Sequence, residues 1–329
     1  MLSIAIIGAG RIGQIHARNV VANPRARLAG IADLDASAAA SLAEACGSSV
    51  ISLHVAFGAD AVMICSSTPT HAGLIERGAA VGRPMFCEKP IDLSSARARA
   101  CLSAVRRARV PLMVGFNRRF DPSFATLKRR LDAGEIGRLE LLTIISRDPS
   151  PPPLAYIAAS GGLFHDMMIH DLDMARFLLG EEPVEVFAAA SSVVDPGIGA
   201  AGDVDTAIAT LRTSHGVLCQ ISNSRRATYG YDQRIEAHGS AGLLRAGNLT
   251  PTTVELATAQ GFTTDPVLPF FLERYADAYR AELDAFIDAV AERREPSPNG
   301  EDGLRALLLA DAITEAAREH RAISLSKEL

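Results

Sequence analysis

The stretch "SIAIIGAGRIGQIHARNVV", residues 3–21, decides the fold of the first part of this chain. It opens with an apolar run of strand type and continues with glycines at GxGxxG spacing, at Gly8, Gly10 and Gly13. A helical pattern follows, and a second strand, "RLAGIAD", ends at Asp33, about 20 residues further on. Strand, glycine turn, helix, strand and acid together form the dinucleotide-binding fingerprint. We therefore predict that the helix N-terminus holds the pyrophosphate of a dinucleotide.

The acid at the end of the second strand indicates which dinucleotide is bound. The carboxylate of Asp33 accepts hydrogen bonds from ribose hydroxyls and repels a 2′-phosphate. The next two residues, Leu34 and Asp35, supply no arginine to hold such a phosphate. We therefore predict NAD as cofactor in preference to NADP. Arg11, which with Ile12 completes the predicted glycine-loop contacts, is the one side chain of the loop that could reach a 2′-phosphate.

The alternation of strand and helix continues to about residue 120. Strand-like runs at 60–67, 83–90 and 111–116 are apolar on both faces, as a parallel sheet covered by helices requires. Ligand residues in such sheets follow the carboxyl ends of the strands, which here read "SSTPTH", "CEKP" and "GFNRRFD". The cofactor-binding candidates at these ends are Ser66, Thr68, Glu88, Lys89, Asn117 and Arg118. Residues 1–120 are thus predicted to form an NAD-binding Rossmann domain.

Composition sets the broad class. The chain has 329 residues, enough for two domains, with 48% hydrophobic and 22% charged residues, as in a globular protein. A net charge of −5 argues against a nucleic-acid partner. No apolar run approaches a membrane span and the N-terminus carries no signal-peptide pattern, so we expect no membrane partner. Five scattered cysteines without zinc or redox spacing suit the reducing cytoplasm.

A second stretch, "GGLFHDMMIHDLDMARFLLG" at 161–180, places acids and imidazoles inside an apolar helix. At about 100° per residue, Asp166, His170 and Asp173 lie on one side of that helix. A carboxylate beside an imidazole can orient it as a general base, although a buried histidine satisfied by Asp166 would show the same spacing. A metal site is not predicted, because His165 and His170 are five residues apart and cannot share an ion as an i, i+4 pair does.

Lys89 stands between a buried strand and Pro90. A lysine so placed can reach a substrate hydroxyl beside the cofactor, or it can be an ordinary surface lysine. The sequence alone leaves both interpretations open.

After Asp121 the βαβ rhythm stops. Short strand-like runs follow one another at close spacing, which predicts a largely antiparallel open sheet, and long helices are expected at 275–293 and 302–319. We predict an α/β chain in which 121–329 form an α+β domain. Its C-terminal helix could pack back on the first domain.

Together these motifs resemble those of the Gfo/Idh/MocA oxidoreductases. The resemblance rests on "GAGRIG", "CEKP", "GFNRRFD" and "GGLFHDMMIHDLD", and it runs from end to end. The stretches "NSRRATYGYDQRIEAHG" (223–239) and "PFFLERYADAYRAELDAF" (269–286) resemble the branch that oxidises myo-inositol at C2. The resemblance implies NAD-dependent oxidation of a cyclic polyol, with myo-inositol giving 2-keto-myo-inositol, by a homotetramer. It also implies that domain 121–329 binds the substrate and supports oligomerisation.

The resemblance also implies roles at matching positions. The catalytic set would be Lys89, Asp166 and His170, with His170 as the general base. Asn117 would contact the cofactor. The substrate-binding residues would be Lys89, Arg118, Asp148, Asp166, His170 and Tyr231. Asp148 stands where some relatives carry asparagine, and alternation predicts that Tyr229 and Tyr231 share one strand face.

Three other functions stay open at this stage. The substrate could be another cyclitol or an aldose, such as scyllo-inositol or glucose. The chain could be a non-catalytic NAD sensor on the same fold, or a metal-dependent hydrolase that uses the His/Asp cluster.

Overall fold

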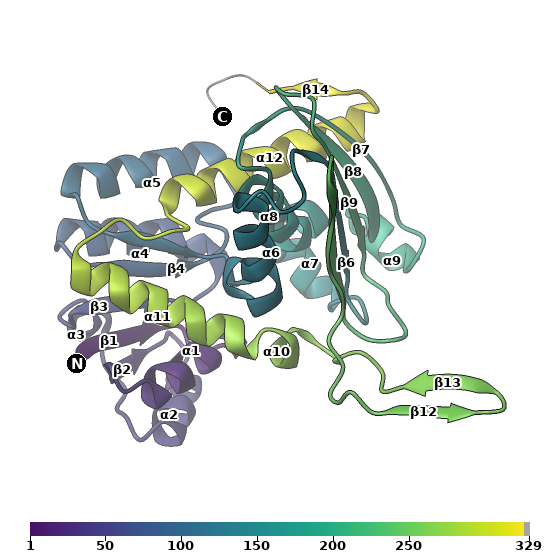
Figure 1. Cartoon of the computed structure of the whole chain (residues 1–329). Helices are drawn as coiled ribbons and strands as arrows, with labels where there is room; N and C mark the ends of the chain where they lie inside the picture. The colour runs from purple at the N-terminus through teal and green to yellow at the C-terminus, as the bar shows by residue number, and fades with distance from the viewer. Residues whose placement is uncertain (326–329) are drawn as a thin grey trace. The chain divides into compact units, whose positions relative to one another are not determined.

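The computed structural model describes residues 1–325, which divide into two compact units (Figure 1). The first unit contains Met1–Asn117 and Ala278–Leu307, and the second contains Arg118–Asp277 and the chain from Leu308 onward. Thirty residues that the sequence assigned to the second domain therefore cluster with the first unit. The helix Ala276–Glu292, most of which lies in this segment, forms ion pairs with the first unit, since Arg25 lies 2.5 Å from both Asp284 and Asp288.

The first unit is built on a five-stranded parallel sheet in the order β2-β1-β3-β4-β5. Its strands are β1 (Leu2–Ile7), β2 (Ala26–Ala32), β3 (Ala61–Ile64), β4 (Met85–Glu88) and β5 (Leu112–Gly115). Its helices are α1 (Arg11–Ala22), α2 (Ala36–Ala45), α3 (Leu53–Ala56), α4 (His71–Ala80), α5 (Ser95–Ala108) and most of α11 (Ala276–Glu292), with the short turn η1 (Thr68–Thr70). The central strands are buried on both faces, which confirms the predicted parallel sheet covered by helices.

The second unit is built on a seven-stranded sheet in the order β11-β10-β6-β9-β8-β7-β14. Its strands are β6 (Leu139–Arg147), β7 (Pro183–Ser191), β8 (Thr206–Thr213), β9 (Leu218–Ser224), β10 (Asp232–Gly239), β11 (Gly242–Ala246) and β14 (Ile323–Ser324). The described helical elements are η2 (Asn117–Phe120), α6 (Pro122–Asp132), α7 (Leu154–Ser160), η3 (Phe164–Met168), α8 (Ile169–Leu179), α9 (Pro196–Ala200), α10 (Phe271–Arg274) and the end of α12 (Gly300–Glu319). Every strand pair is antiparallel except β6 with β9, which confirms the largely antiparallel sheet.

The seven-stranded sheet has one buried and one exposed face. Buried and exposed residues alternate along β8, and α8 packs on β6. The face turned away from this core exposes large apolar side chains on five strands. They are Leu141, Phe187, Ile208, Leu218 and Leu243. An apolar face of this extent is typical of a surface that contacts another protein.

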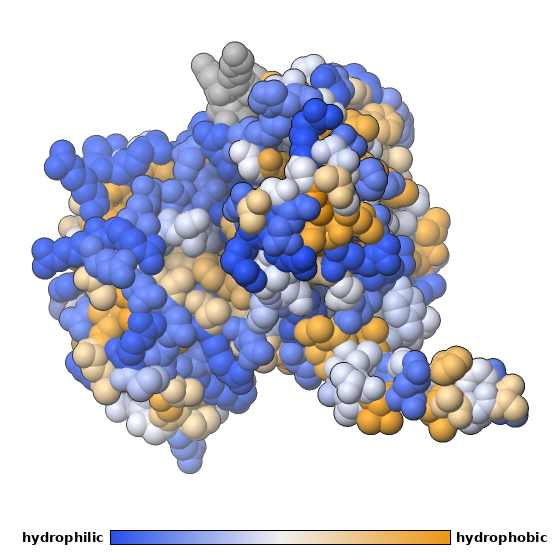
Figure 2. Space-filling model, in the orientation of Figure 1, coloured by the Kyte–Doolittle hydropathy of each residue, from blue (hydrophilic) through white to orange (hydrophobic). Residues whose placement is uncertain are grey.

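A two-stranded hairpin, β12 (Glu255–Thr258) and β13 (Gly261–Thr264), extends from the second unit (Figures 1 and 2). All eight strand residues are exposed, including Leu256 at 60% and Phe262 at 76%. An isolated two-stranded hairpin is marginally stable in water. Its exposed apolar side chains indicate a second surface suited to contact with another chain.

Candidate functional site

The glycine turn between β1 and α1 is shaped to receive a phosphate. Gly8 has φ +109°, and a Cβ there would lie 2.5 Å from the carbonyl carbon of Cys65. A Cβ on Gly13 would lie 1.9 Å from the Gly8 oxygen, so Gly13 lets α1 pack on the turn. A Cβ on Gly10, by contrast, would meet no heavy atom within 4 Å. The backbone at Gly10 therefore faces open space, where the first amides of α1 can donate to a pyrophosphate.

Asp33 lies beside this turn, directly after β2. Its carboxylate accepts hydrogen bonds from the Ala9 amide at 2.5 Å and from the Asp35 amide at 2.8 Å. These bonds fix the carboxylate at the glycine turn and leave it lone pairs for ribose hydroxyls. Leu34 is 94% exposed and carries no charge. The residues of the first unit thus fit NAD, and the exposed Arg11 remains the nearest loop cation in sequence.

Two histidines that the sequence interpretation did not single out hold the segments around the end of β4: His71 joins them to the end of β3, and His16 joins them to α1. His71 is 1% exposed, and its ring nitrogens lie 2.8 Å from the Ser66 oxygen and 2.7 Å from the Pro90 oxygen. His16, fully buried on α1, lies 2.7 Å from Glu88. The residues on both sides of Lys89 are therefore held in place. Ser66 contacts Thr70 at 2.6 Å, and Thr68 begins η1 in the same loop.

In the second unit, Asp166 and His170 lie on two different kinds of helix. Asp166 belongs to the π-helical turn η3 and accepts a hydrogen bond from the Tyr156 hydroxyl at 3.0 Å, whereas His170 lies in the first turn of α8. Both side chains are partly exposed. Single π turns are rare and are frequent at functional sites, which supports a functional role for this stretch.

Asp173, the third residue of the predicted polar seam, is joined to Arg119 of η2 by two hydrogen bonds, at 2.8 and 2.5 Å. His170 and Asp173 lie three residues apart in α8, a spacing that places two residues on one side of an α-helix. Asp166 lies in η3, where the wider i→i+5 turn changes the angle per residue, so a projection at 100° per residue does not apply between Asp166 and His170. That the three side chains share one side stays a prediction.

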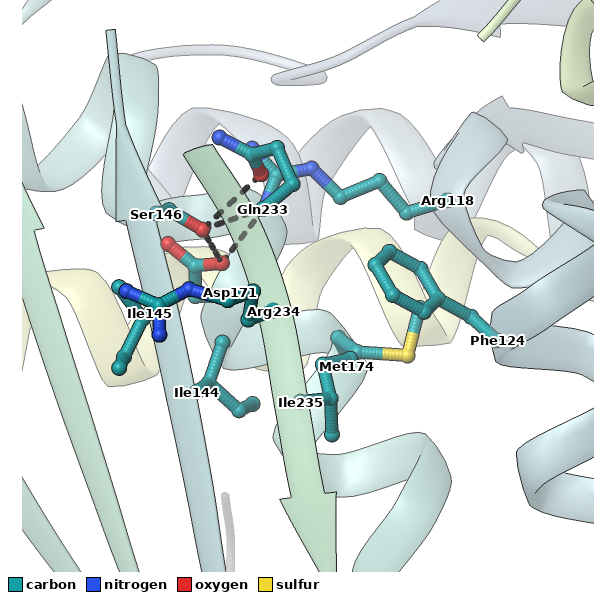
Figure 3. Close-up of a pocket in the computed structure, with 10 residues that line it drawn as sticks. All are labelled: Arg118, Phe124, Ile144, Ile145, Ser146, Asp171, Met174, Gln233, Arg234 and Ile235. Atoms are coloured by element: carbon teal, nitrogen blue, oxygen red, sulfur yellow. Dashed lines mark hydrogen bonds and ion pairs between the residues drawn. The ribbon is translucent and has the colours of Figure 1, made fainter. Parts of the chain in front are cut away.

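Arg118 and Asn117 are almost wholly buried, at 5% and 3% exposure. The guanidinium of Arg118 lies 2.5 Å from Asp171 and 3.0 Å from the Ser146 hydroxyl (Figure 3). It also stands over the ring of Tyr275. Within the second unit, Arg118 is therefore part of a buried polar network. Burial lowers the pKa of Arg118, whereas Tyr275 and Asp171 raise it; the net change is a rise, so Arg118 stays charged.

The other predicted substrate residues of the second unit lie near this network. Burial raises the pKa of Asp148 to about 6, with Arg225 lowering it and Asp166 raising it. Because Arg118 also acts on Asp148, these predicted residues share one charged cluster. Burial raises the pKa of Tyr231 well above its ordinary value, so its hydroxyl stays protonated at neutral pH.

The strand prediction for the two tyrosines is wrong. β10 begins at Asp232, so Tyr229 and Tyr231 precede the strand, at the end of a glycine-containing turn. Tyr229 is 48% exposed and donates to Asp232 at 2.6 Å, whereas Tyr231 is 6% exposed. Gly230 between them, at φ +123°, breaks the alternation on which the prediction rested.

His165 is paired with Asp311 of α12 at 2.8 Å. Among residues 1–325, no three His, Cys, Asp or Glu side chains are grouped as a metal site would require. In the same part of the chain no helix is long and apolar enough to cross a membrane. All five cysteines are free thiols.

Comparisons with known proteins agree with this geometry. Residues 2–116 match the family model described as "Oxidoreductase family, NAD-binding Rossmann fold", and residues 124–245 match the "GFO/IDH/MocA C-terminal domain". The chain is 52% identical over 324 residues to the inositol 2-dehydrogenase of Rhizobium meliloti, with 98% of each chain covered. It is 46% identical over 331 residues to the myo-inositol 2-dehydrogenase of Thermotoga maritima, with 99% of each covered.

A solved structure gives the same result in three dimensions. A myo-inositol dehydrogenase from Corynebacterium glutamicum superposes with a TM-score of 0.95 at 49% identity, with 99% of each chain covered. Similarity at this level over the full length extends to both units, including the stretches that carry Lys89 and His170. This chain belongs to the Gfo/Idh/MocA family of NAD-binding oxidoreductases.

Proposed function

We propose that this protein oxidises myo-inositol at C2 to 2-keto-myo-inositol with NAD. The observation that carries the proposal is the 52% identity, over 98% of both chains, to an inositol 2-dehydrogenase. The glycine turn and Asp33 support the cofactor, since they offer amide donors to a pyrophosphate and a carboxylate to a ribose. NAD, when bound, supplies the acceptor for the hydride that leaves the substrate carbon.

The catalytic residues of the proposal are Lys89, Asp166 and His170. His170 takes the proton from the reacting hydroxyl as its general base. Lys89 donates a hydrogen bond to the same oxygen and stabilises its alkoxide character. Asp166, which the Tyr156 hydroxyl holds in place, orients His170 or a neighbouring hydroxyl. The fixed positions of Glu88 and Pro90 support this role of Lys89, because they hold the backbone on both sides of it.

Polyol recognition is assigned to Tyr231, Asp148 and Arg118. A buried, protonated Tyr231 can donate to a substrate hydroxyl, and the Asp148 carboxylate can accept from one. Sites built from such groups discriminate strongly between hydroxyl orientations, because a mismatched substrate leaves buried polar groups unpaired.

A substrate panel tests the proposal. NADH formation is measured with myo-inositol, scyllo-inositol, the chiro-inositols and glucose, and NADPH formation is measured when NADP replaces NAD. We expect the highest kcat/KM for myo-inositol with NAD. Turnover of glucose or a linear polyol without turnover of any inositol would refute the substrate, and equal efficiency with NADP would refute the cofactor preference.

We further propose that the protein is a homotetramer of the cytoplasm. The exposed apolar face of the seven-stranded sheet and the hairpin β12–β13 support assembly, and the free cysteines suit a reducing compartment. Analytical ultracentrifugation tests the assembly: a monomer at micromolar concentration refutes it. Introducing a charge at Phe187, on the exposed face, is expected to dissociate the assembly.

A further inference from the structure

One row of side chains across the buried face of the seven-stranded sheet is polar, whereas the rows beside it are apolar. Asn223 of β9 and Gln233 of β10 both lie in register with Ser146 of β6. The next two rows are Ile221, Ile144 and Ile235, and then Cys219, Leu142 and Ala237. All nine side chains are buried. Because buried polar groups are costly unless they are hydrogen-bonded, the polar row requires a partner.

The partner is Asp171 of α8, which has no exposed surface. Its Oδ1 lies 2.6 Å from the Ser146 hydroxyl and 2.5 Å from Arg118, and its Oδ2 accepts from the Asn223 amide at 2.8 Å. Ser146 also lies 3.1 Å from the Gln233 oxygen, as the dashed lines of Figure 3 show. One carboxylate thus joins α8 to three other elements: β6, β9 and η2.

Stability does not explain this arrangement well. Replacing a buried ion pair by apolar residues is often neutral or stabilising, so the benefit of retaining one lies in the geometry that it enforces. Asp171 follows His170 directly, in the first turn of α8. That turn comes after the π-helical η3, so no regular α-helix continues from it toward the N-terminus. Three bonds to the residue next to His170 fix how the first turn is rotated and how far it stands from the sheet.

We infer that Asp171 is a positioning residue that sets the orientation of His170. The inference rests on the proposed role of His170 as general base. Asp171 acts through the helix backbone and through Arg118. Its loss leaves His170 present but misplaced, and a small displacement of a catalytic group is enough to slow the chemical step.

The test is the variant Asp171→Asn, measured with myo-inositol and NAD. We expect kcat to fall by about tenfold or more, toward the loss typical when a general base is removed. The KM for NAD stays within about twofold of wild type, because the glycine turn and Asp33 lie in the other unit. A thermal melt gives the loss of stability in parallel.

The matched control is Asp121→Asn. Asp121 is 1% exposed and, like Asp171, is paired with a buried arginine of the second unit, Arg274, but it lies at the start of α6. Asparagine caps a helix as well as aspartate does, so this variant keeps the cap and removes the charge and one of the two acceptors that face Arg274. We expect a lower melting temperature with kcat within about threefold of wild type. Equal losses of kcat in the two variants, or a kcat within threefold of wild type in Asp171→Asn, would overturn the inference.

Two milder variants decide the matter if Asp171→Asn does not fold. Ser146→Ala and Asn223→Leu each remove one donor and keep the pair of Arg118 with Asp171. A lower kcat with an unchanged KM for NAD in either variant supports the inference, and an unchanged kcat in both overturns it. His170→Ala separates the two proposals: if that variant keeps its kcat, the role of His170 is wrong whatever the Asp171 variants show.

Discussion

Glu282 on α11 offers a quantitative test of how burial controls charge in this fold. Its side chain is 0% exposed, and within the described chain both carboxyl oxygens lack a hydrogen-bond partner. Burial raises the pKa of Glu282 well above its usual range, and the nearby carboxylate of Glu88 raises it further. Burial also raises the pKa of the Cys65 thiol, and Glu282 contributes to that rise. Glu282 therefore keeps its proton in the folded protein at a pH where it would be ionised in the unfolded chain.

The pH dependence of stability follows from this difference. Between the ordinary glutamate pKa, about 4.3, and the raised pKa, the folded protein binds one proton more than the unfolded chain. The free energy of unfolding therefore falls by about 1.4 kcal/mol for each pH unit in that interval as the pH rises. Glu282→Gln keeps the shape of the neutral acid and cannot ionise. Its stability relative to wild type should therefore rise with pH at the same slope.

Thermal melting of both proteins from pH 5 upward measures this effect. About 1.4 kcal/mol corresponds to roughly 3–6 °C in melting temperature for a unit of this size, so the gap should widen by that amount per pH unit. Glu292→Gln is the control on the same helix, because the side chain of Glu292 is 61% exposed. Its melting curve should run parallel to that of wild type. Parallel curves for Glu282→Gln as well would show that Glu282 is ionised in the folded protein and would refute the reasoning.

Three further predictions concern the site. His170→Ala should lower kcat by about 10² to 10⁴ while NAD binding, measured by fluorescence titration, stays near wild type, and a folded His170→Ala enzyme with full kcat would contradict the assignment. His165→Ala should mainly lower the melting temperature, since His165 pairs with Asp311. Asp33→Ala should reduce kcat/KM for NAD by about 10- to 100-fold, which is the loss expected when hydrogen bonds to a charged group are removed. If the ratio of kcat/KM with NAD to kcat/KM with NADP stayed unchanged, the result would count against the ribose contact. The pKa of Asp148, about 6, means that its carboxyl is protonated at pH 5 and ionised at pH 7. The polyol KM of wild type should therefore fall from pH 5 to pH 7, and that of Asp148→Asn should not. Identical pH profiles of this KM in the two proteins would remove Asp148 from the site.

Local sequence patterns predicted the parts of this fold that depend on neighbouring residues. The glycine turn, the helix after it and the acid at Asp33 lie within one short segment, and the periodicity of the apolar residues identified most strands of both sheets. The short strands β11 and β14 were not predicted. The patterns failed where a local rule was interrupted. A π turn at Phe164–Met168 has the same apolar content as an α-helix, so the sequence did not distinguish the two. Gly230 likewise ended the strand pattern before Tyr231.

Partners far apart in the sequence could not be predicted, because no period relates them. Arg118 and Asp171 are 53 residues apart, and His16 and Glu88 are 72 apart. For Asp171 the sequence showed only that acids lie inside the apolar stretch 161–180, and for the pair of His16 with Glu88 it gave no signal.

The residues of these long-range pairs differ in burial from the residues proposed to meet the substrate. The residues proposed to meet the substrate, such as His170 and Lys89, are partly exposed, as chemistry on a bound molecule requires. The groups bonded next to them, Asp171 and His16, are fully buried. Asp171 can adopt few alternative arrangements, since each would leave a polar atom unpaired in the core. We therefore propose that the buried groups set orientation and the partly exposed ones carry out the chemistry, so that substitution of Asp171 should lower kcat while the KM for NAD is retained.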